Sequence, residues 1–276
     1  MHFWQNIYEH FNPIAFEIFG LPVHWYGLMY VLALFVALAI GRYFVKKDAI
    51  RLTSKELESY FIYIEIGIIL GARLGYILFY DPNTLYYLTH PWQIFNPFAG
   101  GEFVGIRGMS YHGAVVGFFI SSWLFSRKHK DSFATLMDLV AISVPLAFVF
   151  GRIGNFLNQE LVGRATEVSW GILVDGVLRH PSQLYEALLE GVVLFFILYA
   201  YRSVQKFRGE LILIYGIGYG VLRFIAEFWR EADEQIGYLC CDTITQGQIF
   251  SLAMSALGLI LWLYFKKKLY NRALDR

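Results

Sequence analysis

Long apolar segments alternate with short polar ones along the whole chain. Seven of them are long enough, or nearly so, to cross a hydrocarbon layer of about 30 Å as helices. These expected spans cover residues 23–44, 61–80, 108–126, 135–156, 183–201, 210–229 and 247–265. The pattern predicts an all-α integral membrane protein, a bundle of about seven transmembrane helices that forms one domain, residues 1–276.

Composition supports this class. The chain is 57% hydrophobic and 16% charged, whereas soluble domains carry about 25% charged residues. The net charge of +1 gives no electrostatic signature of a nucleic-acid partner. Residues 1–20 contain no Lys or Arg, so we expect no secretory signal peptide. Residues 157–182 are too short for a domain, and we expect a small strand-bearing cap there, around residues 168–174.

Basic residues set the expected orientation. Lys and Arg mark cytoplasmic loops, and they follow spans one, three, five and seven, whereas the opposite loops hold only Arg164 and Arg179. We therefore expect the N-terminus and the cap outside and the C-terminus in the cytoplasm. The basic loop residues are Arg42, Lys46, Lys47, Arg51, Lys55, Arg127, Lys128, Lys130, Arg202, Lys206, Arg208, Lys266, Lys267, Lys268, Arg272 and Arg276.

A dense polar block interrupts the end of span four. Arginine at the centre of a membrane helix costs roughly 2.5–3.5 kcal/mol on insertion scales, so it needs a polar partner. If the segment is helical, Arg152, Asn155 and Gln159 share one face. Together with Asn158 and Glu160 they predict a polar pocket that holds an anion. The alternative is a cluster of interhelical hydrogen bonds that only holds the bundle together.

Arginines inside or at the edge of the spans all fall in the predicted outer half of the membrane. They are Arg73, Arg107, Arg152, Arg223 and Arg230. A guanidinium group offers a planar fork of donors that fits phosphate, and a lipid phosphate of the outer leaflet lies at this depth. We single out Arg152 and Arg223. The alternative is that carboxylates neutralise them, Arg152 through Glu160 and Arg223 through Glu227 at i+4.

The remaining candidates each have a functional and a structural interpretation. His112 can act as a general base, or its side chain can hydrogen-bond a backbone carbonyl at the end of a helix. His180 precedes a proline in a loop, and its role is either substrate binding or structural. Tyr26 and Tyr219 can donate to a ligand oxygen or pack at the interface. No nucleophile motif or metal cluster is visible. The neighbours Cys240 and Cys241 cannot form a relaxed disulfide, and we assign them no role.

Several stretches together resemble the bacterial prolipoprotein diacylglyceryl transferases. The resemblance extends from span one almost to the end of the chain. It is carried by Gly151–Arg164, by His24–Tyr30, by Gly71–Tyr76, by Met109–Gly113, by His180–Glu186 and by Gly218–Gly220 with Arg223, Glu227 and Arg230.

The resemblance implies an enzyme of the bacterial cytoplasmic (inner) membrane, multi-pass and without cofactor or metal. Its family transfers the diacylglyceryl group of phosphatidylglycerol to the lipobox cysteine thiol of prolipoproteins, and glycerol 1-phosphate leaves. Phosphatidylglycerol, the prolipoprotein signal peptide and membrane lipids are then the partners. The implied catalytic residues are His112, Arg152, Arg223, Tyr26 and Tyr219. The implied substrate-binding residues are Arg152, Asn155, Asn158, Glu160, Gly163, Arg223, Arg73, Glu227, Arg230 and His180.

Two other functions compete with this one. A transporter or flippase for an anionic lipid would need polar residues through the full membrane depth, but the inner halves of the spans are almost wholly apolar. A non-catalytic membrane scaffold would leave the one-sided clustering of the arginines unexplained.

Overall fold

All seven predicted apolar segments are helical in the computed structural model, which describes residues 2–103, 105–129, 132–232, 237–240 and 244–274. The fifth span is continuous through a wider π-helical turn, η3. The corresponding elements are α2 (Trp25–Lys47), α3 (Ser54–Phe79), α5 (Tyr111–His129), α6 (Phe133–Leu157), α7 (Ser182–Glu186) with η3 (Ala187–Val193) and α8 (Leu194–Arg202), α9 (Glu210–Ala226) and α10 (Gln246–Leu274).

Five of these helices are long and apolar enough to cross a membrane, among the residues that the structure describes. They are α2, α3, α6, the run from α7 to α8, and α10. The other two differ for local reasons: α9 has only 17 residues, and α5 ends in the basic residues Arg127, Lys128 and His129. The chain is therefore a mostly helical membrane protein.

Short elements connect or precede the long helices. Every sheet in the described part of the chain is a two-stranded antiparallel hairpin. These elements are α1 (His2–Gln5), η1 (Ile7–Glu9), β1 (Ile14–Ile18), β2 (Leu21–His24), α4 (Thr84–Thr89), η2 (Pro91–Gln93), β3 (Phe98–Ala99), β4 (Glu102–Phe103), β5 (Ile172–Val174), β6 (Val177–Arg179), β7 (Tyr238–Cys240) and β8 (Ile244–Thr245).

The predicted cap does contain strands. β5 and β6 pair in register from Ile172 opposite Arg179 to Val174 opposite Val177. The turn between them is Asp175-Gly176, and both residues have positive φ, as the type I′ hairpin turn requires. The strand begins later than expected, at Ile172, because Gly171 closes a turn back to Val168.

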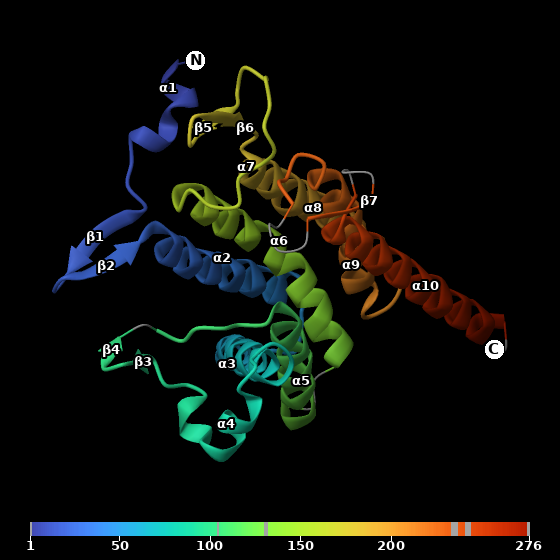
Figure 1. Ribbon diagram of the computed structural model, residues 1–276. Helices are drawn as coiled ribbons and strands as arrows, with labels where there is room; N and C mark the ends of the chain where they lie inside the picture. The colour runs from blue at the N-terminus through green and yellow to red at the C-terminus, as the bar shows by residue number, and fades with distance from the viewer. Residues whose placement is uncertain (1, 104, 130–131, 233–236, 241–243, 275–276) are drawn as a thin grey trace. The chain divides into compact units, whose positions relative to one another are not determined.

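Two compact units make up the chain. One consists of Met1–Phe44 with Met137–Arg276, and the other of Val45–Leu136. In the smaller unit α3 and α5 lie side by side (Figure 1). Small residues line their contact: Gly67, Gly71 and Gly75 on α3 face Gly113 and Gly117 on α5, and a Cβ on any of them would meet the partner helix. Such spacing lets two membrane helices approach closely.

In the larger unit, α9 lies against α10 and against the fifth span (Figure 1). Two carboxylates, Asp138 half-buried and Glu210 buried, close the connection between α8 and α9. Asp138 Oδ2 accepts from the Gly209 N–H at 2.6 Å, and Glu210 Oε1 accepts from Tyr201 at 2.7 Å and from Trp262 at 2.9 Å. Both residues lie at the predicted cytoplasmic ends of their spans, residues 135–156 and 210–229. Both accept hydrogen bonds from their own fold.

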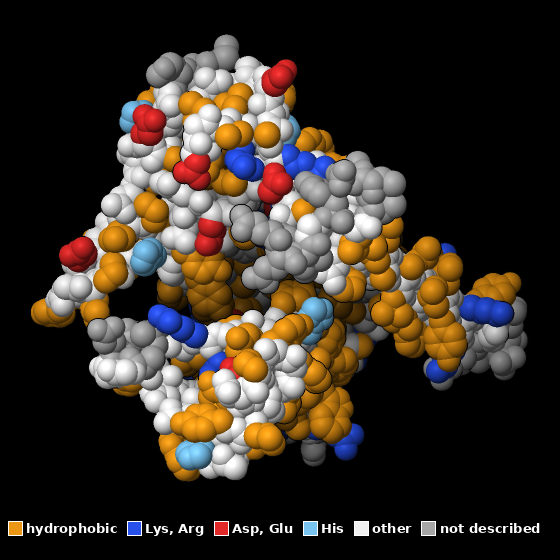
Figure 2. Space-filling model, viewed as in Figure 1, with side chains coloured by type: hydrophobic (Ala, Val, Ile, Leu, Met, Phe, Trp, Pro, Cys, Tyr) orange, Lys and Arg blue, Asp and Glu red, His pale blue; other side chains and the backbone are white. Residues whose placement is uncertain are grey.

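Apolar side chains cover the outside of several long helices. Figure 2 shows them along α10, with Lys and Arg side chains near its C-terminal end. Apolar side chains facing outward are expected where lipid is the solvent. Cys241 lies outside the described residues.

Candidate active site

Arg223 is the centre of a buried ionic cluster. It lies in the last turn of α9 and is only 8% exposed. Its Nη1 is 2.6 Å from Glu186 Oε2 and 3.4 Å from Glu190 Oε1, and its Nη2 is 2.7 Å from Glu227 Oε2. The predicted pair with Glu227 is confirmed, and two further carboxylates join it from the fifth span.

Arg152 reaches the same cluster from α6. Its Nη2 is 3.0 Å from Glu186 Oε2, the oxygen that Arg223 also contacts. The guanidinium lies over the ring of Phe148, 4.7 Å from its centroid. Its Nε is buried and has no hydrogen-bond partner among the residues that the structure describes. The two arginines therefore converge on one carboxylate oxygen, and one of them keeps a spare donor.

Asn155 links Arg152 to Glu160. Arg152 Nη1 donates to Asn155 Oδ1 at 3.2 Å, and Asn155 Nδ2 donates to Glu160 Oε1 at 2.7 Å. The prediction that Arg152 and Asn155 share a helix face is confirmed. The alternative of a direct pair between Arg152 and Glu160 is wrong, since the amide lies between them and Arg152 pairs with Glu186.

Gln159 does not share that face. α6 ends at Leu157, and Gln159 has a left-handed backbone with φ 58°. Its Nε2 instead donates to the carbonyls of Tyr8 and Phe11, each at 3.2 Å. Contacts with the N-terminal segment thus fix the chain after the helix. The prediction assumed that the helix continues through Gln159 and did not include these contacts. Asn158 lies in the same turn and donates its backbone N–H to the Gly154 carbonyl at 2.9 Å.

Both candidate tyrosines contact helices of the cluster. The Tyr219 ring meets Phe148 edge-on with centroids 6.2 Å apart, and its hydroxyl interacts with the Glu190 carboxyl group. Tyr26 lies in the first turn of α2 against Gly154, where an added Cβ would be 3.2 Å from its Cδ2. Tyr219 therefore lies on the helix that carries Arg223, and Tyr26 lies on a helix that contacts the one carrying Arg152.

Gly163, His180 and Arg230 form a second group through their backbones. Gly163 bridges to Arg230 and donates its N–H to the His180 carbonyl at 2.9 Å. A Cβ at Gly163 would lie 2.7 Å from both the Cβ and the carbonyl oxygen of His180 and would collide with the Trp229 carbonyl. Burial lowers the pKa of His180, so its neutral form is favoured. This group joins the cap to the end of α9.

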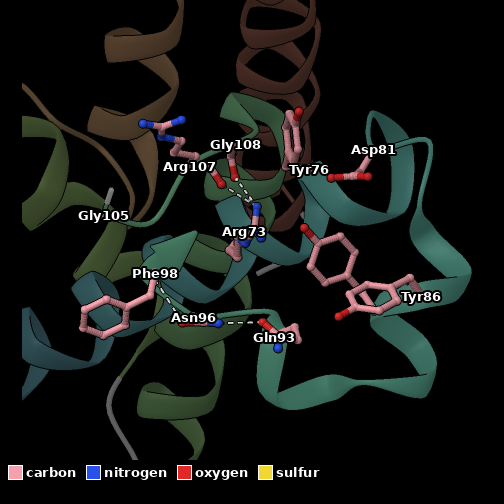
Figure 3. Close-up of a pocket in the computed structure, with 11 residues that line it drawn as sticks. Arg73, Tyr76, Asp81, Tyr86, Gln93, Asn96, Phe98, Gly105, Arg107 and Gly108 are labelled. Carbon is pink, nitrogen blue, oxygen red and sulfur yellow. Dashed lines mark hydrogen bonds between the residues drawn. The ribbon is translucent and has the colours of Figure 1, made fainter. Parts of the chain in front are cut away.

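Arg73 and His112 belong to the smaller unit. Arg73 is 6% exposed, and it donates to the carbonyls of Ile94 at 2.5 Å, of Gly108 at 3.3 Å and of Arg107 (Figure 3). It thus fastens the loop between α4 and α5. His112 lies exposed in the first turn of α5, with Nδ1 3.4 Å from the Tyr80 hydroxyl.

A polar cavity of about 240 Å³ adjoins Arg73. Figure 3 shows the Asn96 amide bonded to the Gln93 side chain, with Nδ2 2.6 Å from Oε1. Its lining residues are Arg73, Tyr76, Asp81, Tyr86, Tyr87, Gln93, Asn96, Phe98, Gly105, Arg107 and Gly108. All eleven residues come from α3 or from the segment that connects α3 to α5, so the cavity is a local feature of this part of the chain.

Sequence reasoning gave no role to Glu186, which it named only as the end of the motif His180–Glu186, and it missed Glu190. They are 0% and 1% exposed, and they hold the two arginines together. The available signal was a pair of carboxylates four residues apart inside an apolar span, where an ionisable side chain by default indicates function. Gln183, one turn earlier, donates to the Glu160 carbonyl at 2.5 Å. The described residues include no group of His, Cys, Asp or Glu that could hold a metal ion.

Fold and site together define a multi-pass membrane protein with two guanidinium groups gathered on buried carboxylates. A model of the prolipoprotein diacylglyceryl transferase family matches residues 13–264, and the chain belongs to this family.

Named relatives are similar over nearly their full length. Phosphatidylglycerol–prolipoprotein diacylglyceryl transferase of Wolinella succinogenes is 66% identical over 265 residues, which is 96% of this chain and 97% of the relative. The enzyme of the same name from Campylobacter jejuni is 60% identical over 271 residues, 98% and 100% of the two chains. That from Campylobacter hominis is 62% identical over 258 residues, 94% and 92%.

Proposed function

We propose that this chain transfers the diacylglyceryl group of phosphatidylglycerol to the lipobox cysteine thiol of prolipoproteins and releases glycerol 1-phosphate. It is an enzyme of lipoprotein biosynthesis, a transferase. Relatives that carry the name of this activity are 60–66% identical over nearly the whole chain, and the family match covers residues 13–264.

One observation carries the mechanism: Arg152 and Arg223 meet on Glu186 Oε2, at 3.0 and 2.6 Å. A carboxylate that bridges two guanidiniums occupies the kind of position that a phosphate oxygen also fits. The incoming lipid phosphate displaces one or both of these contacts and takes in addition the spare Arg152 Nε. The two cations then face the oxygen on which negative charge grows as the phosphate monoester leaves.

The reaction is a displacement at carbon. The cysteine sulfur, as thiolate, attacks the glyceryl C3 carbon, so the S–C bond forms while the C–O bond to phosphate breaks. A thiol with a pKa of about 8.5 must first lose its proton. His112 is the proposed acceptor, since imidazole exchanges protons near neutral pH. Tyr26 and Tyr219 are the proposed hydroxyl donors to the substrate.

The other candidates support these groups. Asn155 and Glu160 orient the Arg152 fork through their two hydrogen bonds, and Glu227 orients Arg223. The remaining substrate-binding residues of the proposal are Asn158, Gly163, Arg73, Arg230 and His180. For Arg73, Gly163 and His180 the contacts described above favour a role in shaping the site, which positions substrate indirectly.

We place the enzyme in the bacterial cytoplasmic membrane as one domain of seven spans, with the N-terminus and the cap in the periplasm. The basic loops support this orientation. The proposed seven spans are the five helices that are long and apolar enough to cross a membrane, together with α5 and α9. Both of these coincide with apolar segments predicted from the sequence. Phosphatidylglycerol and the signal peptide of the prolipoprotein are the partners; a nucleic-acid partner is not expected.

A direct assay tests the function. Purified protein in detergent, phosphatidylglycerol and a lipobox peptide should give a peptide whose mass rises by one diacylglyceryl group, together with free glycerol phosphate. A peptide with Ser in place of the lipobox Cys should not react. A lipid transporter or a scaffold would leave the peptide mass unchanged in both cases, and that result would refute the proposal.

A further inference from the structure

The buried cluster has more carboxylates than cations. Glu186, Glu190 and Glu227 all contact Arg223, and Arg152 adds one further positive charge. All three glutamates are at most 4% exposed. With every carboxylate ionised, the directly contacting groups would therefore carry a net negative charge. An uncompensated charge at such burial is costly, and uptake of a proton is the usual way in which a protein avoids it.

The contacts indicate which carboxylate has the least support. Glu186 and Glu227 lie 2.6 and 2.7 Å from Arg223 nitrogens, and Glu227 also accepts from Thr245 at 2.9 Å. The Glu190 contact with Arg223 is longer, at 3.4 Å, and only Glu186 is also in contact with Arg152. Each of the three glutamates keeps one buried oxygen without a hydrogen-bond partner among the described residues, so the distances make the distinction. Glu190 is thus the carboxylate that the cations stabilise least.

The backbone at Glu190 is also unusual. Residues Ala187–Val193 form a π-helical segment, η3, with Glu190 at its middle. Gly191 follows, and a Cβ there would be 3.2 Å from the Pro145 carbonyl of α6. π-helical turns are rare and occur frequently at functional sites. A wide turn that places an ionisable group against Arg223, rather than toward lipid, favours a chemical role for that group.

We propose that Glu190 carries a proton in the resting enzyme and is the general acid of the transfer reaction. This inference rests on the proposed function. As the C–O bond breaks, its electron pair goes to the phosphate oxygen, which takes the Glu190 proton. The proton lost by the cysteine thiol later restores Glu190. Thiol and phosphodiester monoanion thus become thioether and monoester monoanion, and no proton is gained or lost overall.

The groups that face Glu190 are consistent with this assignment. Arg223 and Tyr219 approach from α9, Glu186 lies one turn earlier on its own span, and Arg152 approaches from α6. The two arginines retain their charge at any relevant pH. They compensate Glu186 and Glu227, and a neutral Glu190 leaves their attraction for an incoming phosphate undiminished.

Two readouts test the proposal with E190Q, which imitates a protonated carboxyl group in size and charge. The infrared C=O band of a protonated carboxylic acid should be present in the wild-type enzyme and absent from E190Q. In the peptide assay kcat should fall about 10²-fold, the scale of lost general acid catalysis. KM for phosphatidylglycerol should change less than about threefold, since charge in the resting site is the same.

E186Q, one turn earlier on the same span, tests the charge balance. Without Glu186 the two remaining carboxylates match the two arginines, so Glu190 should ionise, the band should disappear and kcat should fall because the acid has lost its proton. The proposal is wrong if the wild-type enzyme lacks the band, if E190Q keeps it or retains wild-type kcat, or if E186Q keeps both the band and wild-type kcat. A fall of more than roughly 5 °C in the Tm of E190Q would also contradict a neutral Glu190.

The band can be measured without substrate. If the wild-type protein shows it and yet transfers no lipid, the transferase function fails while the protonation of Glu190 stands. If the wild-type protein transfers lipid and lacks the band, only the assignment of Glu190 fails.

Discussion

Arg223→Lys is the sharpest perturbation of the cluster. Arg223 holds Glu186, Glu190 and Glu227 at 2.6, 3.4 and 2.7 Å through two nitrogens of one planar fork. A lysine keeps the charge but concentrates it in one ammonium group on a flexible chain, which cannot reproduce a bidentate geometry. At least one buried carboxylate then loses its partner, and the phosphate loses one of its two guanidinium donors.

The expected size follows from this geometry. Removing one partner of a buried ion pair costs about 3–5 kcal/mol, and 1.36 kcal/mol corresponds to a tenfold change in rate. If most of this cost falls on the transition state, kcat/KM should decrease by roughly 10²- to 10³-fold.

The assay is transfer from phosphatidylglycerol to a lipobox peptide, followed by mass spectrometry. Arg208→Lys is the matched control, because Arg208 is exposed in the loop between α8 and α9, and it should keep wild-type activity. Activity of folded Arg223→Lys within about threefold of the wild type would refute the reasoning, since a charge without the fork would then suffice.

Three further predictions concern packing and protonation. Gly163→Ala should destabilise the protein by about 1–3 kcal/mol in thermal unfolding, because its Cβ would meet backbone of His180 and Trp229; Gly151→Ala, with open space around it, should not. Gly117→Ala should lower the Tm through the α3–α5 contact, and an unchanged Tm would contradict that contact. Because burial depresses the pKa of His180, the folded state resists protonation and loses stability as pH falls below about 6.5. A His180→Asn variant should lose less between neutral and acid pH, and equal losses would argue against this effect.

The helical elements were predictable because their information is local. Uninterrupted apolar segments specify membrane helices, and all seven predicted segments are helical. The pair Arg223–Glu227 was equally accessible, since i,i+4 spacing places the two side chains on one helix face. Such inferences need only the period of one helix.

Interactions between helices were beyond this reasoning. No helical period indicates that Glu186 meets Arg152 and Arg223 together, because the three side chains come from three separate spans. The end of α6 at Leu157 depends on distant partners too, as the Gln159 contacts with Tyr8 and Phe11 show. Likewise, the spacing of Gly67, Gly71 and Gly75 indicates a close helix contact, but not that α5 is the partner.

The resemblance to a family supplied what single residues could not. From the residues alone, Arg152 and Arg223 predicted a site for an anion in the outer half of the membrane. The diacylglyceryl transfer reaction was inferred from the motifs that the chain shares with the family. The family match over residues 13–264 confirms that resemblance. The residue roles stay proposals, and their physical basis is the sharing of Glu186 Oε2 by the two guanidinium groups.

An experimental structure with phosphatidylglycerol bound would test the central claim most directly. The account predicts the lipid phosphorus between Arg152 and Arg223, with a phosphate oxygen in hydrogen-bond distance of each and Glu186 displaced from at least one of them. A phosphate bound elsewhere, with both arginines still on Glu186, would contradict it.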